Sequence, residues 1–334
     1  MENLLKVENL VQKFDLNTDF LDKFKFKNGK ITIEKKLVNA VNDVSFEIKK
    51  GEVFGLVGES GCGKSTTAKT VIKIYDPKAG KIIFKGEDIS DYNYKEMLPV
   101  RKNIQMIFQD PYASLNPRQR LQDIIMEPML FHNLVADKKE AYDKMLDIIE
   151  RVGLRKEHAY RFPHQFSGGQ RQRIGIARAL AVEPEFIIAD EPVSALDVSI
   201  QAQILNILMD LKEEFGFSYL FIAHDLSVVK HISDRLGVMY LGYIVEKGDK
   251  AKIFKNPLHP YTKALFSAVP TIDEAKISDP IELKGEVPNP TKLPSGCYFH
   301  GRCPYRQKIC KEERPVLVEI EDNHQVACHL VDSI

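Results

Sequence analysis

The chain has 334 residues, of which 44% are hydrophobic and 28% charged, as in an ordinary soluble globular protein of about two domains. Its 47 basic residues balance its 47 acidic residues, so it lacks the overall basic excess of a dedicated nucleic-acid binder. Its longest apolar runs are strand-sized, well short of the roughly 20 residues that a membrane-spanning helix needs. The sequence also begins without the charged and apolar regions of a signal peptide, so we expect a cytoplasmic protein that reaches a membrane only through a partner.

Short apolar strands alternate with helical segments along most of the chain, which predicts a parallel α/β core. A mostly helical run over 119–160, punctuated by Pro128 and Gly153, interrupts this alternation and indicates a helical insert. Residues 15–37 are rich in Lys, Asp and Asn and indicate a polar insertion or mobile loop, and seven prolines between 257 and 294 indicate a linker. The predicted strands are 4–14, 38–48, 53–57, 104–108, 185–189 and 217–223, and the predicted helices are 66–75, 170–181 and 199–214.

A phosphate-binding loop is the most specific motif. Residues 58–65 read Gly-Glu-Ser-Gly-Cys-Gly-Lys-Ser and fit G-x-x-x-x-G-K-[ST] between a predicted strand and a predicted helix. The glycines let backbone N–H groups face inward, where they and the helix N-terminus bind phosphate oxygens. We expect Lys64 to reach the β- and γ-phosphates, Ser65 to bind Mg²⁺ and Thr66 to add a phosphate contact. The predicted nucleotide ligands here are Gly58, Glu59, Ser60, Gly61, Cys62, Gly63, Lys64, Ser65 and Thr66.

Two carboxylates directly follow the predicted strand 185–189. In phosphate-loop enzymes the aspartate at such a strand end holds Mg²⁺, which predicts that role for Asp190. Glu191 is then placed to polarise the attacking water as a general base. A helix that opens with Ser167-Gly-Gly-Gln170 presents unpaired N–H groups and a positive dipole end, which suits a second anion.

The run Ser167-Gly-Gly-Gln170 resembles the signature motif of ATP-binding-cassette (ABC) ATPases, and the similarity extends over roughly residues 4–330. In that family each nucleotide lies between the phosphate loop of one subunit and the signature motif of the other. The resemblance implies that Gln109 is the Q-loop glutamine, that Ser194-Ala-Leu-Asp197 is the D-loop and that His224 is the switch histidine at the γ-phosphate. The implied catalytic residues are Glu191, His224 and Gln109, the further nucleotide contacts are Ser167, Gly168, Gly169, Gln170 and Asp197, and the Mg²⁺ ligands are Ser65, Gln109 and Asp190.

The family also stacks an aromatic ring on adenine upstream of its phosphate loop. Phe14 ends the first predicted strand and is our candidate, with Phe24 and Phe26 as alternatives. The fold that the resemblance implies is an α/β phosphate-loop cassette over 1–256, with a parallel-sheet core, an antiparallel β subdomain and a helical subdomain at about 110–165. A C-terminal extension over 257–334 would carry a small Cys-rich module.

Four stretches look specifically like the ATP-binding subunits of oligopeptide and dipeptide permeases, namely 109–117, 163–170, 190–198 and 259–265. They imply ATP hydrolysis that drives oligopeptide import, by a subunit bound peripherally to the cytoplasmic face of the cell membrane. The implied partners are a second, non-identical ABC ATPase, two membrane permease subunits and indirectly an extracytoplasmic substrate-binding protein, without nucleic acid. Oligosaccharide or nickel cargo is the alternative within this class, and a soluble non-transport ABC ATPase, an exporter ATPase and an iron–sulfur redox enzyme are alternatives outside it.

Four of the five cysteines lie in the last 38 residues, with five, six and seventeen residues between them. No C-x-x-C pair occurs, so the pattern is not that of a zinc ribbon, while four cysteines suit a [4Fe–4S] cluster. The run 296–304 resembles the C-terminal module of peptide-permease ATPases, where such clusters occur. Zinc and free thiols are the alternatives. The predicted cluster ligands are Cys297, Cys303, Cys310 and Cys328.

Two smaller features complete the expected nucleotide site. Cys62 lies inside the phosphate loop and is interpreted as a small tolerated residue rather than a redox regulator. Basic residues also bracket the signature motif, so we expect positive charge where the ATP of a partner subunit binds. These residues are Arg155, Lys156, Arg161, Arg171, Arg173 and Arg178, against Glu157.

Overall fold

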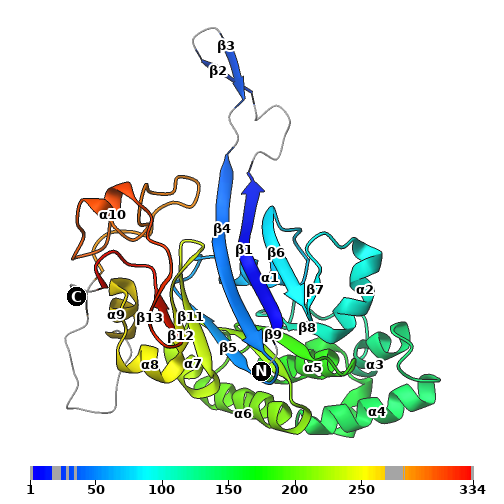
Figure 1. The fold of residues 1–334 in the computed structure, drawn as a ribbon. Helices are drawn as coiled ribbons and strands as arrows, with labels where there is room; N and C mark the ends of the chain where they lie inside the picture. Colours follow the sequence, from blue (N-terminus) through cyan, green and yellow to red (C-terminus); the bar gives the residue numbers. More distant parts are fainter. Residues whose placement is uncertain are drawn as a thin grey trace. The chain divides into compact units, whose positions relative to one another are not determined.

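A computed structural model describes residues 3–16, 24–27, 30–33, 36–267, 281 and 283–331 (Figure 1). The chain divides into two compact units, each assembled from segments far apart in the sequence. The first unit comprises Met1–Leu4, Ile48–Gly55 and Asp91–Asp234, and the second comprises Leu5–Glu47, Leu56–Ser90 and Arg235–Ile334. The predicted domains 1–256 and 257–334 divide the chain differently and stay a prediction.

A sheet with strand order β5-β10-β9-β8 lies at the centre of the first unit. Strand β9 pairs in parallel with β10 on one side and with β8 on the other, so that Ile188 lies opposite both Leu220 and Met106. Every residue of β9 and β10 is buried, as in strands covered on both faces. The predicted parallel α/β core is therefore confirmed. The elements of this unit are β5 (Val53–Val57), which runs into the second unit, α2 (Tyr94–Asn103), β8 (Ile104–Ile107), α3 (Leu121–Phe131), α4 (Lys138–Arg151), two 3₁₀ turns (Lys156–Tyr160 and Pro163–Gln165), α5 (Gly168–Leu180), β9 (Phe186–Asp190), α6 (Val198–Phe215), β10 (Ser218–Ile222) and α7 (Leu226–Ile232).

The helical insert consists mainly of α3 and α4, which pack on each other and on α5 (Figure 1). The Asp137 side chain accepts the N–H groups of residues 139 and 140, which fixes the start of α4. The buried face of α4 is formed by Ala141, Met145 and Ile149, four residues apart, as in an amphipathic helix. Pro128 lies inside α3 instead of ending it.

The second unit is built from antiparallel strands. One sheet has the order β4-β1-β6-β7, with β1 and β4 side by side in Figure 1, and β6 antiparallel to both β1 and β7. A second group of strands follows the order β13-β14-β12-β11, and its three pairings are antiparallel. These elements are β1 (Asn3–Asp15), β2 (Phe24–Lys27), β3 (Lys30–Ile33), β4 (Leu37–Lys49), α1 (Lys64–Val71), β6 (Ala79–Phe84), β7 (Glu87–Asp88), β11 (Arg235–Tyr240), β12 (Tyr243–Asp249), α8 (Lys250–Lys255), α9 (Pro260–Ser267), α10 (Ile309–Glu312), β13 (Val318–Glu321) and β14 (His324–Val326).

The polar segment 15–37 is more ordered than its composition predicts. Strands β2 and β3 pair antiparallel within it, with residues 27 and 30 opposite each other. The interpretation of 15–37 as a polar insertion or mobile loop therefore missed the paired strands formed by these eight residues. The overlooked signal is alternation of apolar and polar residues on either side of Asn28-Gly29, a sequence typical of two-residue hairpins.

The proline-rich stretch 257–294, predicted as a linker, begins with a helix. Helix α9 buries Tyr261 completely, so this part of the stretch is packed. Residues 268–280 and 282 of the stretch lie outside the described residues. Among the helices in the described ranges, none is both long and apolar enough to cross a membrane.

Candidate functional site

At two positions, the phosphate loop has a backbone conformation that only glycine fits. Gly58 and Gly63 have φ of 150° and 106°, in the region that L-residues rarely adopt. A Cβ atom on Gly58 would lie 2.1 Å from the carbonyl oxygen of Met239, and one on Gly63 would lie 2.2 Å from that of Ala40. The loop is thus held between β4 and β11, and its first and last glycines are required because other backbone approaches them closely.

The Lys64 side chain binds carbonyl groups on the inner side of the phosphate loop. Its side chain is buried, and Nζ donates to the carbonyl oxygens of Gly58 at 2.7 Å and Glu59 at 3.2 Å. The positive charge is therefore held in the concave side of the loop, at the N-terminus of α1, where both charge and helix dipole favour an anion.

Cys62 packs inside this loop and is 3% exposed. Burial raises the pKa of its thiol, an effect that the nearby charge of Lys64 opposes. A buried cysteine that stays protonated is a poor nucleophile, which agrees with its interpretation as a small tolerated residue.

Three predicted catalytic residues of the first unit follow the carboxyl ends of neighbouring strands. Gln109 follows β8, Glu191 follows β9 directly after the buried Asp190, and His224 follows β10. Glu191 adopts a left-handed φ of 46°, and its N–H donates to the carbonyl oxygen of Ile222. The turn after β9 therefore begins at Glu191 with a left-handed residue whose N–H is held by β10.

The side chains of Gln109 and His224 meet at one oxygen of Glu191. Gln109 Nε2 donates to Glu191 Oε2 at 2.8 Å, and His224 Nδ1 lies 3.4 Å from the same atom. A cavity of about 30 Å³ is lined by Glu191, Ser194 and His224, which is enough room for one water molecule. This grouping can orient a water molecule beside a carboxylate.

The signature motif caps helix α5. Ser167 Oγ accepts the N–H of Gln170, while Gln170 Oε1 accepts the N–H of Ser167, a reciprocal capping box. Ser167 and Gly168 are exposed, so the N-terminus of α5 is open to a partner.

The D-loop lies against this helix start. A Cβ atom on Gly169 would lie 2.5 Å from Ile200 Cγ2, and one on Gly168 would lie 3.6 Å from Leu196 Cδ2. The side chain of Gln201 holds the D-loop by donating to the carbonyl oxygens of residues 193 and 196, while Asp197 is exposed at the start of α6. Signature motif and D-loop therefore form one packed surface.

Replacing Gly169 with alanine should loosen that surface. The new methyl group would meet Ile200, and such overpacking costs about 1–3 kcal/mol of unfolding free energy. A matched control lies in the same helix, because nothing lies within 4 Å of a Cβ on Gly175. Gly175→Ala should therefore stabilise the chain by about 0.5–1 kcal/mol. Urea unfolding of both variants and of Gly169→Ala/Ile200→Ala tests this, and equal effects of the two single substitutions would contradict it.

Several arginines that bracket the signature motif serve internal contacts. Arg171 Nε donates to the carbonyl oxygen of Pro163, and its guanidinium lies 4.9 Å from the ring centre of Tyr112. Arg173 donates to the carbonyl oxygen of residue 152, and Arg178 donates to that of residue 114, just after the Q-loop glutamine. Burial lowers the pKa of Arg178. These three arginines therefore connect the segment after Gln109 and the helical insert to α5. Attraction of a partner's ATP by the basic residues stays a prediction.

Phe14 lines an open cavity of about 710 Å³ in the second unit, together with Tyr75, Asp76 and Lys78. The two rings contact edge to face, with centres 5.0 Å apart. The role of Phe14 in stacking on adenine stays a prediction. The side chains of the alternatives, Phe24 and Phe26, lie outside the described residues.

The four C-terminal thiols lie near one another. Burial, together with smaller contributions from the thiols of Cys310, Cys328 and Cys303, raises the pKa of Cys297 to about 11. The sulfur atoms of Cys297, Cys303 and Cys328 each accept the backbone N–H two residues later. In the part of the chain that the structure describes, however, no three His, Cys, Asp or Glu residues are arranged to hold a metal ion. The side chains as they stand are therefore not a formed cluster site.

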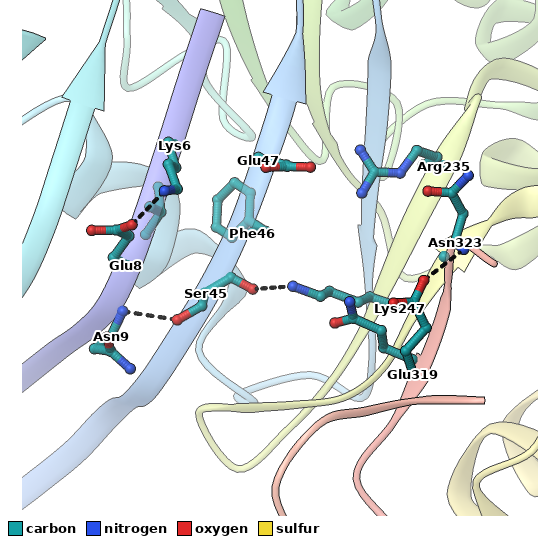
Figure 2. A pocket seen from close by; sticks show the side chains of 13 residues that line it. Lys6, Glu8, Asn9, Ser45, Phe46, Glu47, Arg235, Lys247, Glu319 and Asn323 are labelled. Carbon is teal, nitrogen blue, oxygen red and sulfur yellow. Dashed lines mark hydrogen bonds and ion pairs between the residues drawn. The ribbon is translucent and has the colours of Figure 1, made fainter. Parts of the chain in front are cut away.

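A separate polar cavity of about 330 Å³ lies between β1, β4 and the C-terminal strands of the second unit (Figure 2). Its groups contact one another: Lys6 pairs with Glu8 at 2.6 Å, and Lys247 Nζ donates to the carbonyl oxygen of Ser45 at 3.0 Å. Its lining includes none of the described residues that the sequence predicts as ligands. We assign no role to this cavity.

Two residues that we did not predict as ligands contact the phosphate loop. Arg302 forms an ion pair with Glu59, and the hydroxyl of Tyr261 accepts the N–H of Glu59. The signal for Tyr261 was its place in the stretch 259–265. Arg302 lies in the run 296–304, in which only the cysteines were given a role.

The phosphate loop, the strand-end carboxylates and the capped signature helix on this fold define an ATP-hydrolysing cassette of the ABC type. Residues 41–194 match the family model described as ABC transporter, and residues 245–310 match that described as oligopeptide/dipeptide transporter, C-terminal region. The chain is also similar to the dimeric ATP-binding cassette MJ0796 in a post-hydrolysis state bound to ADP and Pi. That comparison has a TM-score of 0.63 and 27% identity, and covers 74% of this chain and 98% of that one.

Curated relatives are closer. The oligopeptide transport ATP-binding protein AppF of Bacillus subtilis (strain 168) is 57% identical over 88% of this chain and 90% of its own length. The dipeptide transport ATP-binding protein DppF of Escherichia coli (strain K12) is 46% identical over 97% of this chain and 95% of its own length. The chain belongs to the family of oligopeptide and dipeptide ABC transporter ATP-binding subunits.

Proposed function

We propose that ATP hydrolysis by this chain drives import of oligopeptides or dipeptides across the cytoplasmic membrane. The observation that carries the proposal is 57% identity to an oligopeptide transport ATP-binding protein over 88% of the chain. The match of residues 245–310 to the C-terminal region of such transporters supports it independently of the cassette. These similarities favour peptides over oligosaccharide or nickel cargo, and a transporter over a soluble ABC ATPase.

In this proposal Glu191 is the general base that takes a proton from the attacking water. Gln109 and His224 orient the water and the Glu191 carboxylate, since both contact Glu191 Oε2. His224 also contacts the γ-phosphate, while Lys64 and the N–H groups of residues 58–66 bind the phosphates. Phe14 stacks on adenine.

The proposed Mg²⁺ ligands are Ser65, Gln109 and Asp190. Their hydroxyl, amide and carboxylate oxygens are the hard donors that Mg²⁺ prefers. Asp190 is 2% exposed at the end of β9. The bound ion would neutralise charge that develops on the phosphate oxygens.

Two such subunits would enclose two ATP molecules, each between residues 58–66 of one subunit and Ser167–Gln170 of the other, with Asp197 at the same interface. The open N-terminus of α5 supports this arrangement, as does similarity to a cassette described as dimeric. Hydrolysis would remove the γ-phosphate contacts and reopen the dimer. The helical insert would carry this motion to two membrane permease subunits, which hold the chain at the cytoplasmic face, in partnership with a second, non-identical ATPase.

Reconstitution tests the transport function. The chain, its partner ATPase and both permease subunits are placed in vesicles with the extracytoplasmic binding protein. We expect ATP-dependent uptake of labelled dipeptides or oligopeptides, with ATP turnover that rises when peptide is added. Uptake of an oligosaccharide or of nickel, with no response to peptides, would contradict the peptide proposal.

A [4Fe–4S] cluster on Cys297, Cys303, Cys310 and Cys328 remains part of the proposal. Mutual proximity of the thiols and three N–H···S hydrogen bonds support it, since such bonds are typical around metal-bound thiolates. Binding would require the side chains to close around the metal, because no ligand group is formed among the described residues.

Anaerobic purification with iron, sulfide and zinc analysis decides between the three alternatives for this module. We expect brown protein with about four iron and four sulfide per chain. Stoichiometric zinc without iron would establish the zinc alternative. Metal-free protein with four titratable thiols would establish the free-thiol alternative. Cys303→Ser should abolish metal content in either metal case, whereas Cys62→Ser should leave it unchanged.

A further inference from the structure

Glu59, the second residue of the phosphate loop, is fastened by an arginine from the C-terminal segment. Arg302 Nη1 lies 2.7 Å from Glu59 Oε2, and Nη2 lies 3.0 Å from Oε1, so the pair is bidentate. The Arg302 side chain is 9% exposed and that of Glu59 is 28% exposed. A bidentate, largely buried pair fixes geometry more strongly than a single surface contact does.

The backbone of Glu59 is fastened at the same time by a tyrosine of α9. Tyr261 Oη accepts the Glu59 N–H at 2.8 Å. The Tyr261 ring is completely buried and packs against the rings of Tyr240 and Phe299, with centres 4.8 Å and 5.5 Å away. A hydroxyl on so constrained a ring is a fixed acceptor.

A buried carboxylate anchors the start of α9. Glu246 on β12 is completely buried and accepts the N–H groups of Leu258 and His259. It also pairs with His324 Nε2 at 2.8 Å, and His259 Nδ1 in turn accepts the N–H of Tyr261. The stretch 259–265 thus has a structural role, because it positions the Tyr261 hydroxyl to accept the N–H of Glu59 in the phosphate loop.

A tight turn holds Arg302. The N–H groups of Arg302 and Cys303 both donate to the carbonyl oxygen of Phe299, and that of His300 donates to the carbonyl oxygen of Cys297. The Phe299 ring is 1% exposed and packs on Tyr240, which anchors the turn in the same ring cluster as Tyr261. Arg302 and Tyr261 therefore reach Glu59 from one rigid support.

We propose that Arg302 and Tyr261 are positioning residues for ATP, which hold the phosphate loop through Glu59 in the shape that binds phosphate. The loop needs such support because its glycines make the backbone intrinsically mobile. A loop that is already ordered loses less conformational entropy when ATP binds, so the clamp raises affinity without touching a reacting atom. The C-terminal segment is then a working part of the nucleotide site.

Replacement of Arg302 by methionine tests the clamp, because it keeps the apolar stem and removes the guanidinium. Binding of ATP to the full chain, measured by calorimetry, should weaken about tenfold, which is the effect of losing a hydrogen bond to a charged group. The KM for ATP should rise similarly while kcat stays within about twofold, since Glu191 and its neighbours are untouched. Arg302→Lys should restore part of the affinity, because it keeps the charge and loses the bidentate geometry.

Arg314 provides a matched control in the same segment. Its guanidinium pairs with Asp43 at 3.2 Å and lies 5.0 Å from the ring centre of Tyr243, but it does not contact the loop. Arg314→Met should therefore leave the affinity for ATP unchanged. Unchanged affinity in Arg302→Met, or an equal loss in both variants, would overturn the proposal, because the ion pair would then serve only general stability.

Tyr261→Phe gives a second, independent readout that keeps the buried ring. Loss of one neutral hydrogen bond should weaken ATP binding about threefold. Because both residues act through Glu59, the effect of Arg302→Met/Tyr261→Phe should be less than the product of the single effects. Strictly multiplicative effects, or no change of affinity in Tyr261→Phe, would show that the two residues do not form one clamp.

Discussion

Replacing Glu191 with glutamine is expected to slow ATP hydrolysis by about 10²- to 10⁴-fold and to leave ATP binding intact. Glutamine has nearly the same shape and still accepts a hydrogen bond from Gln109 through its amide oxygen, but it cannot take a proton from water. Binding should persist because Glu191 lies beyond the terminal phosphate in the proposed arrangement, while Lys64 and the loop N–H groups hold the nucleotide.

The unusual backbone at Glu191 does not confound this comparison. Its φ of 46° strains any residue with a Cβ, and glutamine and glutamate bear that strain alike. Phosphate release and retained radiolabelled ATP are measured on the assembled protein, where the closed dimer should accumulate. Turnover equal to that of the unsubstituted chain would contradict the assignment of the base.

Glu185 supplies the control for this variant. It comes just before the first residue of β9, so Glu185→Gln removes a carboxylate at the opposite end of the strand from Glu191. Turnover of this control should stay within about twofold of the original, because charge changes away from the reacting atoms have small effects. A similar loss in both variants would point to a general effect of net charge or of strand stability.

The grouping of Gln109, Glu191 and His224 was predictable from the sequence in outline. Neighbouring parallel strands end at the same edge of a sheet, so residues that directly follow them meet there. Gln109 and Glu191 are 82 residues apart, yet both positions follow recognisable apolar strands, and so does His224. Only the left-handed turn that aims Glu191 at both partners had no sequence signal, since glutamate is an uncommon residue at positive φ.

Contacts between remote side chains were not predictable in this way. Arg302 and Glu59 are 243 residues apart, and Arg178 and the carbonyl group of Ser114 are 64 apart. Periodicity and motif spacing report on neighbours along the chain, whereas these pairs depend on how the turns of separate segments approach one another. For the same reason, the sequence shows that basic residues flank the signature motif. It does not show that Arg178 joins the segment after Gln109 to α5.

The cysteines show a different limit. Their number and spacing indicate which metals four thiolates suit, and in the structure the other three thiols lie close enough to Cys297 to raise its pKa. Whether side chains close around an ion depends on the free energy of binding that ion, which the spacing does not contain. The segment 15–37 was misjudged for a simpler reason, because its polar composition outweighed a short alternating pattern.

Replacing Gly63 with alanine is expected to weaken ATP binding by about 100-fold. Two costs add: a left-handed residue with a Cβ costs about 1–2 kcal/mol, and forced overpacking costs about 1–3 kcal/mol. Here the Cβ would lie 2.2 Å from the carbonyl oxygen of Ala40, so the loop must move away from β4. A shift of even 1 Å at the N-terminus of α1 would misalign its N–H groups with the phosphates, since these bonds weaken steeply with angle.

A comparison of three glycines separates steric exclusion from backbone strain. Gly63→Ala has both costs, whereas Gly61 and Gly86 have φ of 77° and 82° with nothing within 4 Å of a new Cβ. Gly86→Ala lies outside the loop, between β6 and β7, and should cost about 1 kcal/mol of unfolding free energy without changing the affinity for ATP. Gly61→Ala introduces backbone strain in the loop without a steric clash, and should weaken ATP binding by about tenfold or less. Calorimetric titration with ATP and urea unfolding measure both quantities, and an affinity of Gly63→Ala equal to that of Gly61→Ala would show that approach of the Ala40 carbonyl does not shape the loop.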